Sequence, residues 1–394
     1  MKRNLVLGVS GGIAVYKALE IVSLLKKKDI NVDVIMTESA TKFVTPLSFQ
    51  SLSQNMVTYD MFAEPKAWEI QHISLAEKAD LFLVAPATAN IIGKIANGIA
   101  DDMLSTTIMA TKAKVIFAPA MNTNMYDNPI VQDNIKKLKS FGYEFIEPAE
   151  GRLACGTTGK GKLESPEVIV DRVLMELNDK KDLVNKNVLV TAGPTIAPVD
   201  PVRFITNRST GKMGYAIAKE ARNRGANVTL ISGPTSIEVP KNINIVKVST
   251  NEEMKKAIME VYDHADIVIK SAAVADYKPK NYSTQKIKKG DNDLCIEFTR
   301  DSDILMELGE KKDKQILVGF AAESQDLKEN AISKLQRKNL DYIVANDITA
   351  NDTGFASEDN KVIVLSKSGK EIYLDKMSKE KIASNLFDII LEKR

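Results

Sequence analysis

Apolar runs of strand length alternate with helix-like segments along this chain, and this alternation limits the fold more than any other feature. Residues 4–9 (NLVLGV) are apolar, residues 13–28 show helical spacing and end in lysines, and residues 31–36 (NVDVIM) are apolar again. A strand, a glycine turn, a helix and a second strand form a βαβ unit, which requires a parallel sheet. The same half contains two further apolar runs and another helical segment, at residues 80–85, 114–119 and 129–140.

The pattern starts again in the second half of the chain. Residues 187–192 (NVLVTA) predict a strand, residues 213–224 a helix and residues 226–231 (ANVTLI) a strand. Runs that are apolar throughout are typical of strands covered on both faces. We therefore predict the α/β class, with two tandem doubly wound Rossmann-like domains and mainly parallel sheets. The remaining strands of this half are expected at residues 265–270, 316–320 and 341–345.

A polar, charged stretch separates the two halves. Residues 176–187 (ELNDKKDLVNKN) follow a predicted helix and precede a predicted strand. Boundaries between domains commonly fall in exposed polar linkers of this kind. We place the boundary near residue 180, which predicts one domain at residues 1–180 and another at residues 181–394.

The 394 residues contain only two histidines and two cysteines. His72 and His264 lie far apart, and Cys155 and Cys295 have no C-x-x-C spacing, which argues against a Cys/His zinc site. Lys+Arg 54 against Asp+Glu 52 gives a net charge of +2, so no basic field indicates nucleic acid or an anionic membrane. Two unclustered cysteines suit a reducing cytoplasm.

No segment has the pattern of a targeting signal or a membrane span. Met1 to Leu7 faintly imitates a signal peptide, but Gly8, Gly11 and Gly12 cut its apolar run short. No stretch approaches the roughly 20 apolar residues that a membrane helix needs. We expect a soluble cytoplasmic protein with no nucleic-acid or membrane partner.

Two glycine-containing turns precede predicted helices, and neither has the spacing of a standard nucleotide-binding motif. Gly8-Val9-Ser10-Gly11-Gly12 has the pattern G-x-x-G-G in place of G-x-G-x-x-G. Arg208-Ser209-Thr210-Gly211-Lys212 lacks the first glycine of a P-loop, because Thr206 stands there. Either turn can approach phosphate through its backbone N–H groups, or can serve only to reverse the chain.

Polar segments of the first half stand where a parallel sheet presents side chains to a ligand. They are His72–Leu75, residues 85–90 (APATAN), residues 119–126 (PAMNTNMY) and residues 154–156 (ACG). Two of them follow predicted strands, and ligands of open α/β sheets bind beyond such strand ends. Cys155 lies among the four glycines of residues 151–161, which favours a lid that carries a proton donor. A structural histidine, an inert cysteine and a turn asparagine are the alternatives.

The second half carries a matching set of segments. They are Thr191–Thr195 (TAGPT), Ile205–Gly214 (ITNRSTGKMG), Ala272–Tyr277 (AAVADY) and Lys286–Lys289 (KIKK). The first and third follow predicted strands, and the second leads into a predicted helix. Taken alone, the lysine cluster is more typical of a solvated charge run than of a binding site.

These motifs resemble two known families joined in a fixed order. The histidine, APATAN, PAMNTNMY and ACG segments resemble the homo-oligomeric flavin-containing cysteine decarboxylases, and the second set resembles phosphopantothenate–cysteine ligase. The resemblance extends over residues 3–390. It implies a bifunctional enzyme of coenzyme A biosynthesis, with the decarboxylase in residues 1–180 and the ligase in residues 181–394.

For the first half, the resemblance implies FMN as cofactor and phosphopantothenoylcysteine as substrate. Oxidation of the thiol-bearing carbon to a thioaldehyde would provide the electron sink for loss of CO₂, and reduction would give 4′-phosphopantetheine. By motif match, His72 is the base, Asn122 binds the substrate carboxylate and Cys155 donates the last proton. Tyr126 stands where the family motif usually has Trp, which retains an aromatic platform. The implied FMN-lining residues are Ser10, Gly11, Gly12, Thr37, Ser39, Phe43, Thr88, Asn90, Ser105 and Thr106.

For the second half, the resemblance implies that CTP activates 4′-phosphopantothenate as an acyl-cytidylate, which cysteine then attacks. Asn207 would hold the phosphopantothenate or the acyl-cytidylate, and Lys286 with Mg²⁺ would neutralise charge on the triphosphate. No ligand for the metal is assigned. Cys295 and His264 match no motif and are interpreted as structural. The implied CTP-binding residues are Ala272, Ala273, Asp276, Lys286, Ser302, Asp303, Ile304, Leu305, Phe320, Lys334 and Lys338.

The resemblance also implies assembly and leaves two other classes to weigh. A trimeric flavin half and a dimeric ligase half would give a homo-oligomer, a dodecamer if every contact forms. An NAD(P)-dependent dehydrogenase fits the glycine turns but not their spacing. A silent flavoprotein regulator would be expected to lose its base or lid cysteine, and this chain keeps His72, Asn122 and Cys155.

Overall fold

The computed structural model divides the chain into two compact units, Met1–Asp179 and Lys180–Arg394. Each unit contains its own sheet and its own buried core, and each is treated separately below. The structure describes residues 3–62, 69–152, 156, 158–289, 294–323, 326–347, 357 and 359–392.

A six-stranded sheet forms the centre of the first unit, with the order β3-β2-β1-β4-β5-β6. All neighbouring strands in it are parallel. The strand order reverses its direction of growth between β1 and β4, which is the point where doubly wound sheets open a crevice for ligands. The strands are β1 (Asn4–Val9), β2 (Asn31–Met36), β3 (Val57–Thr58), β4 (Leu81–Ala87), β5 (Lys114–Pro119) and β6 (Glu144–Phe145).

Helices cover both faces of this sheet. On one face lie α1 (Val15–Lys27), α3 (Pro46–Ser53) and α9 (Pro166–Glu176). On the other lie α4 (Gln71–Lys78), α5 (Ala89–Ala96), α6 (Met103–Ala110) and α8 (Pro129–Ser140). The short helices α2 (Glu38–Thr41) and α7 (Thr123–Tyr126) and the antiparallel hairpin β7 (Ala149–Arg152) and β8 (Thr158–Lys162) complete the unit.

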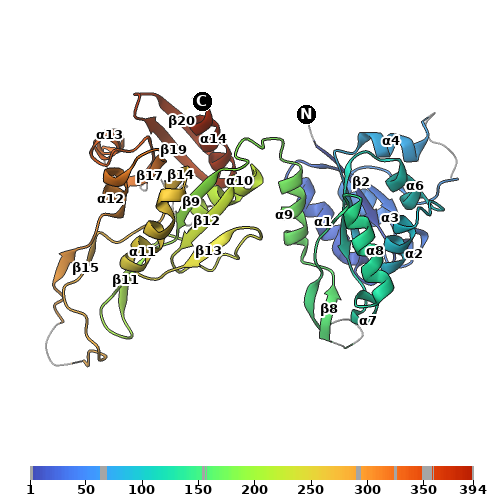
Figure 1. Ribbon diagram of the computed structural model, residues 1–394, viewed down its shortest axis with the longest axis horizontal. Coiled ribbons are helices and arrows are strands. Elements are labelled where there is room, and N and C mark those ends of the chain that lie inside the picture. Colours follow the sequence, from blue (N-terminus) through green and yellow to red (C-terminus); the bar gives the residue numbers. More distant parts are fainter. Residues whose placement is uncertain are drawn as a thin grey trace. The chain divides into compact units, whose positions relative to one another are not determined.

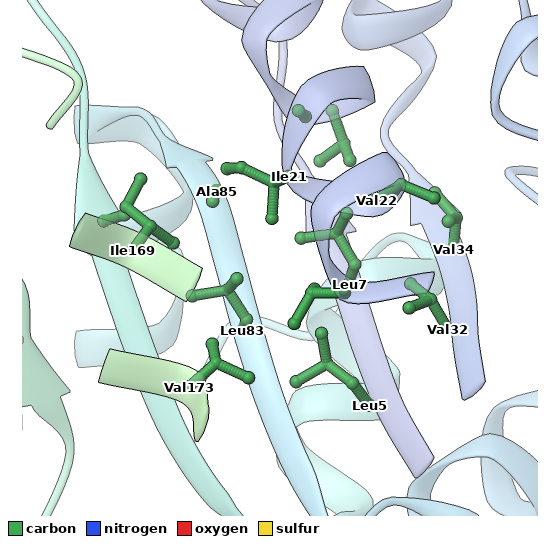
Figure 2. Packing of buried hydrophobic residues seen from close by; sticks show 14 of the residues in the cluster. Leu5, Leu7, Ile21, Val22, Val32, Val34, Leu83, Ala85, Ile169 and Val173 are labelled. Atoms are coloured by element: carbon green, nitrogen blue, oxygen red, sulfur yellow. The ribbon is translucent and has the colours of Figure 1, made fainter. Parts of the chain in front are cut away.

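The packing of α1 shows how the sequence produces this arrangement. Its buried residues recur at helical spacing, and lysines occupy its last turn, where positive charge stabilises the carbonyl end of a helix. Figure 2 shows Ile21 and Val22 of α1 and Val173 of α9 reaching the sheet, with Val173 next to Leu83 and Val22 next to Val34. Each such side chain contributes on the order of 1.5–3 kcal/mol when fully buried. Burial on both faces therefore fixes the sheet between its two helical layers.

The second unit repeats the same strand order in an eight-stranded sheet, β13-β12-β9-β14-β17-β18-β19-β20. The first six strands are parallel, β19 pairs with β18 in antiparallel fashion, and β20 pairs with β19 in the same way. The direction of growth reverses between β9 and β14. The predicted fold class of two doubly wound, mainly parallel domains is confirmed. The strands are β9 (Asn187–Ala192), β12 (Asn227–Ser232), β13 (Asn244–Lys247), β14 (Ile267–Lys270), β17 (Ile316–Glu323), β18 (Tyr342–Asp347), β19 (Asp359–Ser366) and β20 (Glu371–Ser378).

Two helical layers again enclose the sheet, and two ladders extend from it. Helices α10 (Lys212–Asn223) and α14 (Lys379–Leu391) cover one face. Helices α11 (Asn251–Val261), α12 (Ile304–Lys311) and α13 (Leu327–Arg337), with the short helix η1 (Tyr262–His264), cover the other. The ladders are β10 (Ile196–Pro198) with β11 (Phe204–Thr206) and β15 (Tyr277–Pro279) with β16 (Phe298–Arg300), and Figure 1 shows the segments around β11 and β15 running away from the sheet. Within the described ranges, no helix has the length and apolar character needed to span a bilayer.

Candidate active sites

A cavity of about 1050 Å³ opens in the first unit at the carboxyl ends of β1, β2, β4 and β5. Such a volume holds a cofactor together with part of a small substrate. Asn122 also lines it, so the predicted carboxylate-binding residue and the predicted flavin-binding turn share one space. Seven of the ten predicted FMN-lining residues contribute to its wall: Ser10, Gly11, Gly12, Thr37, Ser39, Thr88 and Asn90.

Ser10 joins the ends of β1 and β4 beneath this cavity. Its hydroxyl donates to the Pro86 carbonyl at 2.8 Å and accepts from the Thr88 N–H at 2.9 Å. Thr88 in turn begins α5, and its Oγ1 accepts from the Ile91 N–H. The hydroxyls that form the cavity floor therefore also hold two strand ends together.

Replacing Ser10 by alanine is expected to destabilise the first unit by about 1–3 kcal/mol, because the half-buried Thr88 N–H would lose its acceptor. Ser10 is only 2% exposed, so its hydroxyl is already desolvated where it makes this bond. Urea unfolding followed by circular dichroism measures the loss. Ser51→Ala on the surface of α3 is the control, and an equal effect of both changes would contradict this account.

Asn122 is positioned by the start of α7. Its Oδ1 accepts from the Asn124 N–H at 2.9 Å, as expected of an asparagine that caps a helix. The preceding residue, Met121, donates its N–H to the Gly161 carbonyl at 2.9 Å and so joins this loop to β8. The hairpin strands β7 and β8 are thereby held against the loop that carries Asn122. Cys155, the predicted proton donor, lies outside the described residues.

Tyr126, which replaces the usual Trp, is buried at the end of α7. Its hydroxyl donates to Glu147 Oε2 at 3.1 Å, and the Lys160 Nζ lies 5.8 Å from the ring centroid. Lys160 also contacts Glu147 at 2.9 Å. Burial and the Glu147 carboxylate raise the pKa of Tyr126. An aromatic ring is therefore retained at this position, and Glu147 connects its hydroxyl to Lys160 of β8.

Other predicted residues of the first unit lie away from this cavity. His72 is on α4, Phe43 follows α2, and Ser105 and Thr106 occupy the first turn of α6. Ser105 is fully buried, and its N–H donates to Asp102 at 2.8 Å in a capping box. These four residues therefore do not line the cavity of their own unit, which contains Asn122.

Sequence reasoning missed a group of cations on the same wall. Lys17, Lys94, Arg152 and Lys162 all line the cavity. Burial, and then the charge of Lys162, lowers the pKa of Lys17, whose Nζ donates to the Leu163 carbonyl at 3.4 Å. Lys17 stands in the first turn of α1, where positive charge is unfavourable. A lysine at the start of this predicted helix therefore favours an anion bound nearby, and the sequence alone could have indicated it.

The second unit has a cavity of about 610 Å³ at the carboxyl ends of β14, β17 and β18. Asn207 and the helix-start segment Arg208–Gly214 line it as well. Two of the four motif segments, Ile205–Gly214 and Ala272–Tyr277, therefore meet in one space. Ten of the eleven predicted CTP-binding residues are on its wall: Ala272, Ala273, Asp276, Ser302, Asp303, Ile304, Leu305, Phe320, Lys334 and Lys338.

Hydrogen bonds between loops position Asn207 in this cavity. Its Nδ2 donates to the Ala273 carbonyl at 3.0 Å. The Ala273 N–H donates to the Gly193 carbonyl at 3.0 Å, and the same Ala273 carbonyl accepts from the Thr195 N–H at 3.2 Å. Three segments predicted separately from the sequence are thus joined around one backbone carbonyl.

Gly211 allows α10 to begin directly at the cavity. It is the N-cap of that helix with φ +82°, a conformation that favours glycine. A Cβ on Gly211 would also lie 3.3 Å from the Gly193 nitrogen. The N–H groups of the first turn of α10 therefore face a space where an anion would be stabilised.

Asp303 and Lys338 form an ion pair on the same wall. Their side chains approach to 2.7 Å, and Asp303 Oδ1 accepts from the Met306 N–H at 3.1 Å to cap α12. Burial opposes ionisation of Asp303, but the hydrogen bonds from Lys338 and from that N–H hold its pKa below the usual range. Asp303 is therefore a fixed negative charge at neutral pH.

Lys286, the predicted activating lysine, is exposed and does not line this cavity. The next residue, Ile287, donates its N–H to Asp200 Oδ2 at 3.1 Å and accepts from Arg203 at 3.2 Å. The lysine cluster is thereby attached to the turn between β10 and β11. Sequence reasoning also missed Lys270, Asn346, Asn360 and Lys379, which do line the cavity.

Two doubly wound sheets, each with a nucleotide-sized cavity at the carboxyl ends of its strands, define a two-domain α/β enzyme of the nucleotide-binding class. Residues 1–178 match the family model described as flavoprotein. Residues 183–393 match the model of the DNA/pantothenate metabolism flavoprotein C-terminal domain. The first half is therefore a flavoprotein domain, which decides against the dehydrogenase alternative.

Curated relatives extend over the whole chain. The coenzyme A biosynthesis bifunctional protein CoaBC of Bacillus subtilis is 53% identical over 393 residues, which cover 99% of this chain and 96% of the relative. That of Borreliella burgdorferi is 44% identical over 392 residues, covering 98% and 99%. A crystal structure of the C-terminal domain of a CoaBC protein is 42% identical, covers 54% of this chain and 100% of its own, and has a TM-score of 0.47. The chain belongs to the family of bifunctional coenzyme A biosynthesis enzymes.

Proposed function

We propose that the chain catalyses two consecutive reactions, one in each unit. The ligase, residues 181–394, joins 4′-phosphopantothenate to cysteine at the expense of CTP, and the decarboxylase, residues 1–180, converts phosphopantothenoylcysteine to 4′-phosphopantetheine. One observation carries the proposal: each unit gathers its own set of motif residues around its own cavity. The family match supports the pairing of the two activities.

The cavity of the first unit suits FMN. Gly11 lets the turn after β1 lie directly against Ser39 at the edge of the cavity, because a Cβ on Gly11 would lie 2.4 Å from the Ser39 Cβ. When bound, FMN supplies the two-electron oxidation and reduction that cysteine decarboxylation needs. Ser10, Thr37 and Thr88 would hold the cofactor with hydroxyls and helix-start N–H groups, and Asn122 would orient the substrate carboxylate.

The proposed base and proton donor complete this chemistry. His72 would accept the proton lost on oxidation, and Cys155 would return one at the end. Because His72, Phe43, Ser105 and Thr106 lie outside the cavity of their own unit, a site shared between copies would bring them to a neighbouring cofactor. We therefore propose a homo-oligomer with a trimeric flavin half and a dimeric ligase half, which together would make a dodecamer. Native mass spectrometry measures that state.

The cavity of the second unit suits a nucleotide with a charged tail. Lys334 and Lys338 line it together with the first turn of α10, all of which favour anions. Mg²⁺ is proposed to enter as the complex with the CTP phosphates, since the described residues contain no group of three or more His, Cys, Asp or Glu side chains that could hold a metal ion. Asn207 would hold the activated acyl group while cysteine attacks, and Lys286 would assist activation once its loop approaches.

The proposed setting is the cytoplasm. Cys295 is an exposed free thiol, which suits a reducing compartment. The proposed reactants, 4′-phosphopantothenate, cysteine and CTP, are all small polar molecules.

One experiment tests the proposal as a whole. The purified chain should show the absorption spectrum of a flavin. Incubated with 4′-phosphopantothenate, cysteine, CTP and Mg²⁺, it should release pyrophosphate and CO₂ and form 4′-phosphopantetheine, detected by mass spectrometry. A colourless protein that releases neither gas nor pyrophosphate would contradict the proposal.

A further inference from the structure

Lys270 is the last residue of β14, and its side chain lines the cavity of the second unit. Along this strand Ile269 packs with α10 and α14, whereas Val268 packs with α11, α12 and α13. Because side chains alternate along a strand, Lys270 faces the same side as Val268. It therefore projects toward the start of α12 and the end of α13.

The charged groups that face Lys270 come from three elements. They are Lys338 directly after α13, Asp303 at the start of α12, and Asp276 in the loop after β14. Asp303 is already engaged by Lys338 at 2.7 Å and by the Met306 N–H. In the part of the chain that the structure describes, no hydrogen bond or ion pair reaches the Lys270 ammonium.

A lysine in this position is unfavourable for the protein alone. Desolvation, and then the neighbouring charge of Lys338, lowers the pKa of Lys270 to about 8, although Asp303 and Asp276 act in the opposite direction. A structural lysine would be expected to have a carboxylate within contact, and a purely apolar wall would hold leucine or methionine. An anion placed beside Lys270 and Lys338 would offset both the desolvation of the Lys270 ammonium and the repulsion between the two lysines.

We propose that Lys270 is a nucleotide-binding residue. Its ammonium group holds the negatively charged nucleotide together with the ammonium groups of Lys334 and Lys338. This inference rests on the proposed function, in which this cavity takes CTP. It assigns a role to a residue that belongs to none of the four sequence segments. It also explains why a charged side chain ends a strand that is otherwise apolar (IVIK).

The protonation state of Lys270 then affects nucleotide binding. The bound anion stabilises the ammonium form and raises its pKa above the value of the free protein. The contribution of Lys270 to affinity is therefore fully present below pH 8 and is lost as the pH rises through 8 toward the pKa of the complex. The CTP phosphates are already fully ionised in this range, so their titration does not obscure the effect.

The test measures CTP affinity of the full-length chain with Mg²⁺ by isothermal titration calorimetry at pH 7.5 and pH 9, without 4′-phosphopantothenate. At pH 7.5, Lys270→Met is expected to weaken binding about 10- to 100-fold, the range of a lost charge-assisted contact. The CTP affinity of the wild type should decrease from pH 7.5 to pH 9, whereas the affinity of Lys270→Met should not change. Lys270→Arg keeps the charge, so its affinity should stay constant over this range.

Lys256→Met on the exposed face of α11 is the matched control, and thermal unfolding verifies that each variant folds. Lys270→Gln serves if the methionine variant does not fold. A wild-type chain that binds CTP with the same affinity and pH dependence as Lys270→Met or Lys270→Gln would overturn this inference and leave the proposed function intact. A wild-type chain that does not bind CTP at either pH would instead overturn the proposed function and, with it, this role of Lys270.

Discussion

Gly11→Ala is expected to give a protein that has lost most of its FMN and its yellow colour. The added Cβ would lie 2.4 Å from the Ser39 Cβ and 2.7 Å from the Ser39 carbonyl carbon, distances that force backbone to move. Overpacking of this kind typically costs about 1–3 kcal/mol, and here it displaces the turn that approaches the cofactor. We expect FMN affinity to fall about 100-fold or more, measured from flavin fluorescence during dialysis and reconstitution.

The adjacent glycine is the matched control. A Cβ on Gly12 would meet only Thr88 Cγ2, at 3.8 Å, which is ordinary contact. Gly12→Ala should therefore lower flavin content far less than Gly11→Ala, although both residues border the cavity. Pyrophosphate release in the second unit serves as an internal control for protein quality. Equal flavin loss in the two variants would show that steric contact with Ser39 is not the cause.

The sheets could be predicted from the sequence because their strands are buried on both faces. Runs such as NLVLGV and NVDVIM have no solvent-facing residues to break the pattern, and β1 and β2 have the predicted bounds. The same criterion fails for β19 and β20, which the sequence analysis did not predict. β20 lies at the sheet edge with β19 beside it, and both contain polar or charged residues at several positions, so neither is apolar along its whole length. The order of strands depends on contacts between distant segments and could not be derived from local pattern.

The sites were predictable where short motifs follow strands. The TAGPT, AAVADY and PAMNTNMY segments lie at strand ends, and a parallel sheet brings such ends to one edge. Lys270 was missed because a lysine after an apolar run is typical of a solvated strand end, and only the packing of α12 and α13 on this face of β14 shows that it lines a cavity. Lys286 was assigned by motif, but its position depends on a loop attached to Asp200, which no local signal indicates.

Asn207→Asp is expected to lower ligase activity about 100-fold or more while the decarboxylase remains active. The Asn207 amide donates to the Ala273 carbonyl at 3.0 Å, and a carboxylate cannot donate there and would repel that oxygen. The new charge would also oppose an anionic nucleotide in the same cavity. Pyrophosphate release and formation of phosphopantothenoylcysteine, followed separately, show whether activation or amide formation is affected.

The control for this substitution adds the same charge to the same unit but outside the cavity. Asn244 is exposed at the start of β13, so Asn244→Asp should leave both ligase readings near those of the wild type. The decarboxylase is assayed in each variant with phosphopantothenoylcysteine supplied directly, because this bypasses the ligase. If Asn207→Asp abolished both activities, the two cavities would not act as separate sites. If it changed neither, the bond between Asn207 and the Ala273 carbonyl would have no role in holding the activated acyl group.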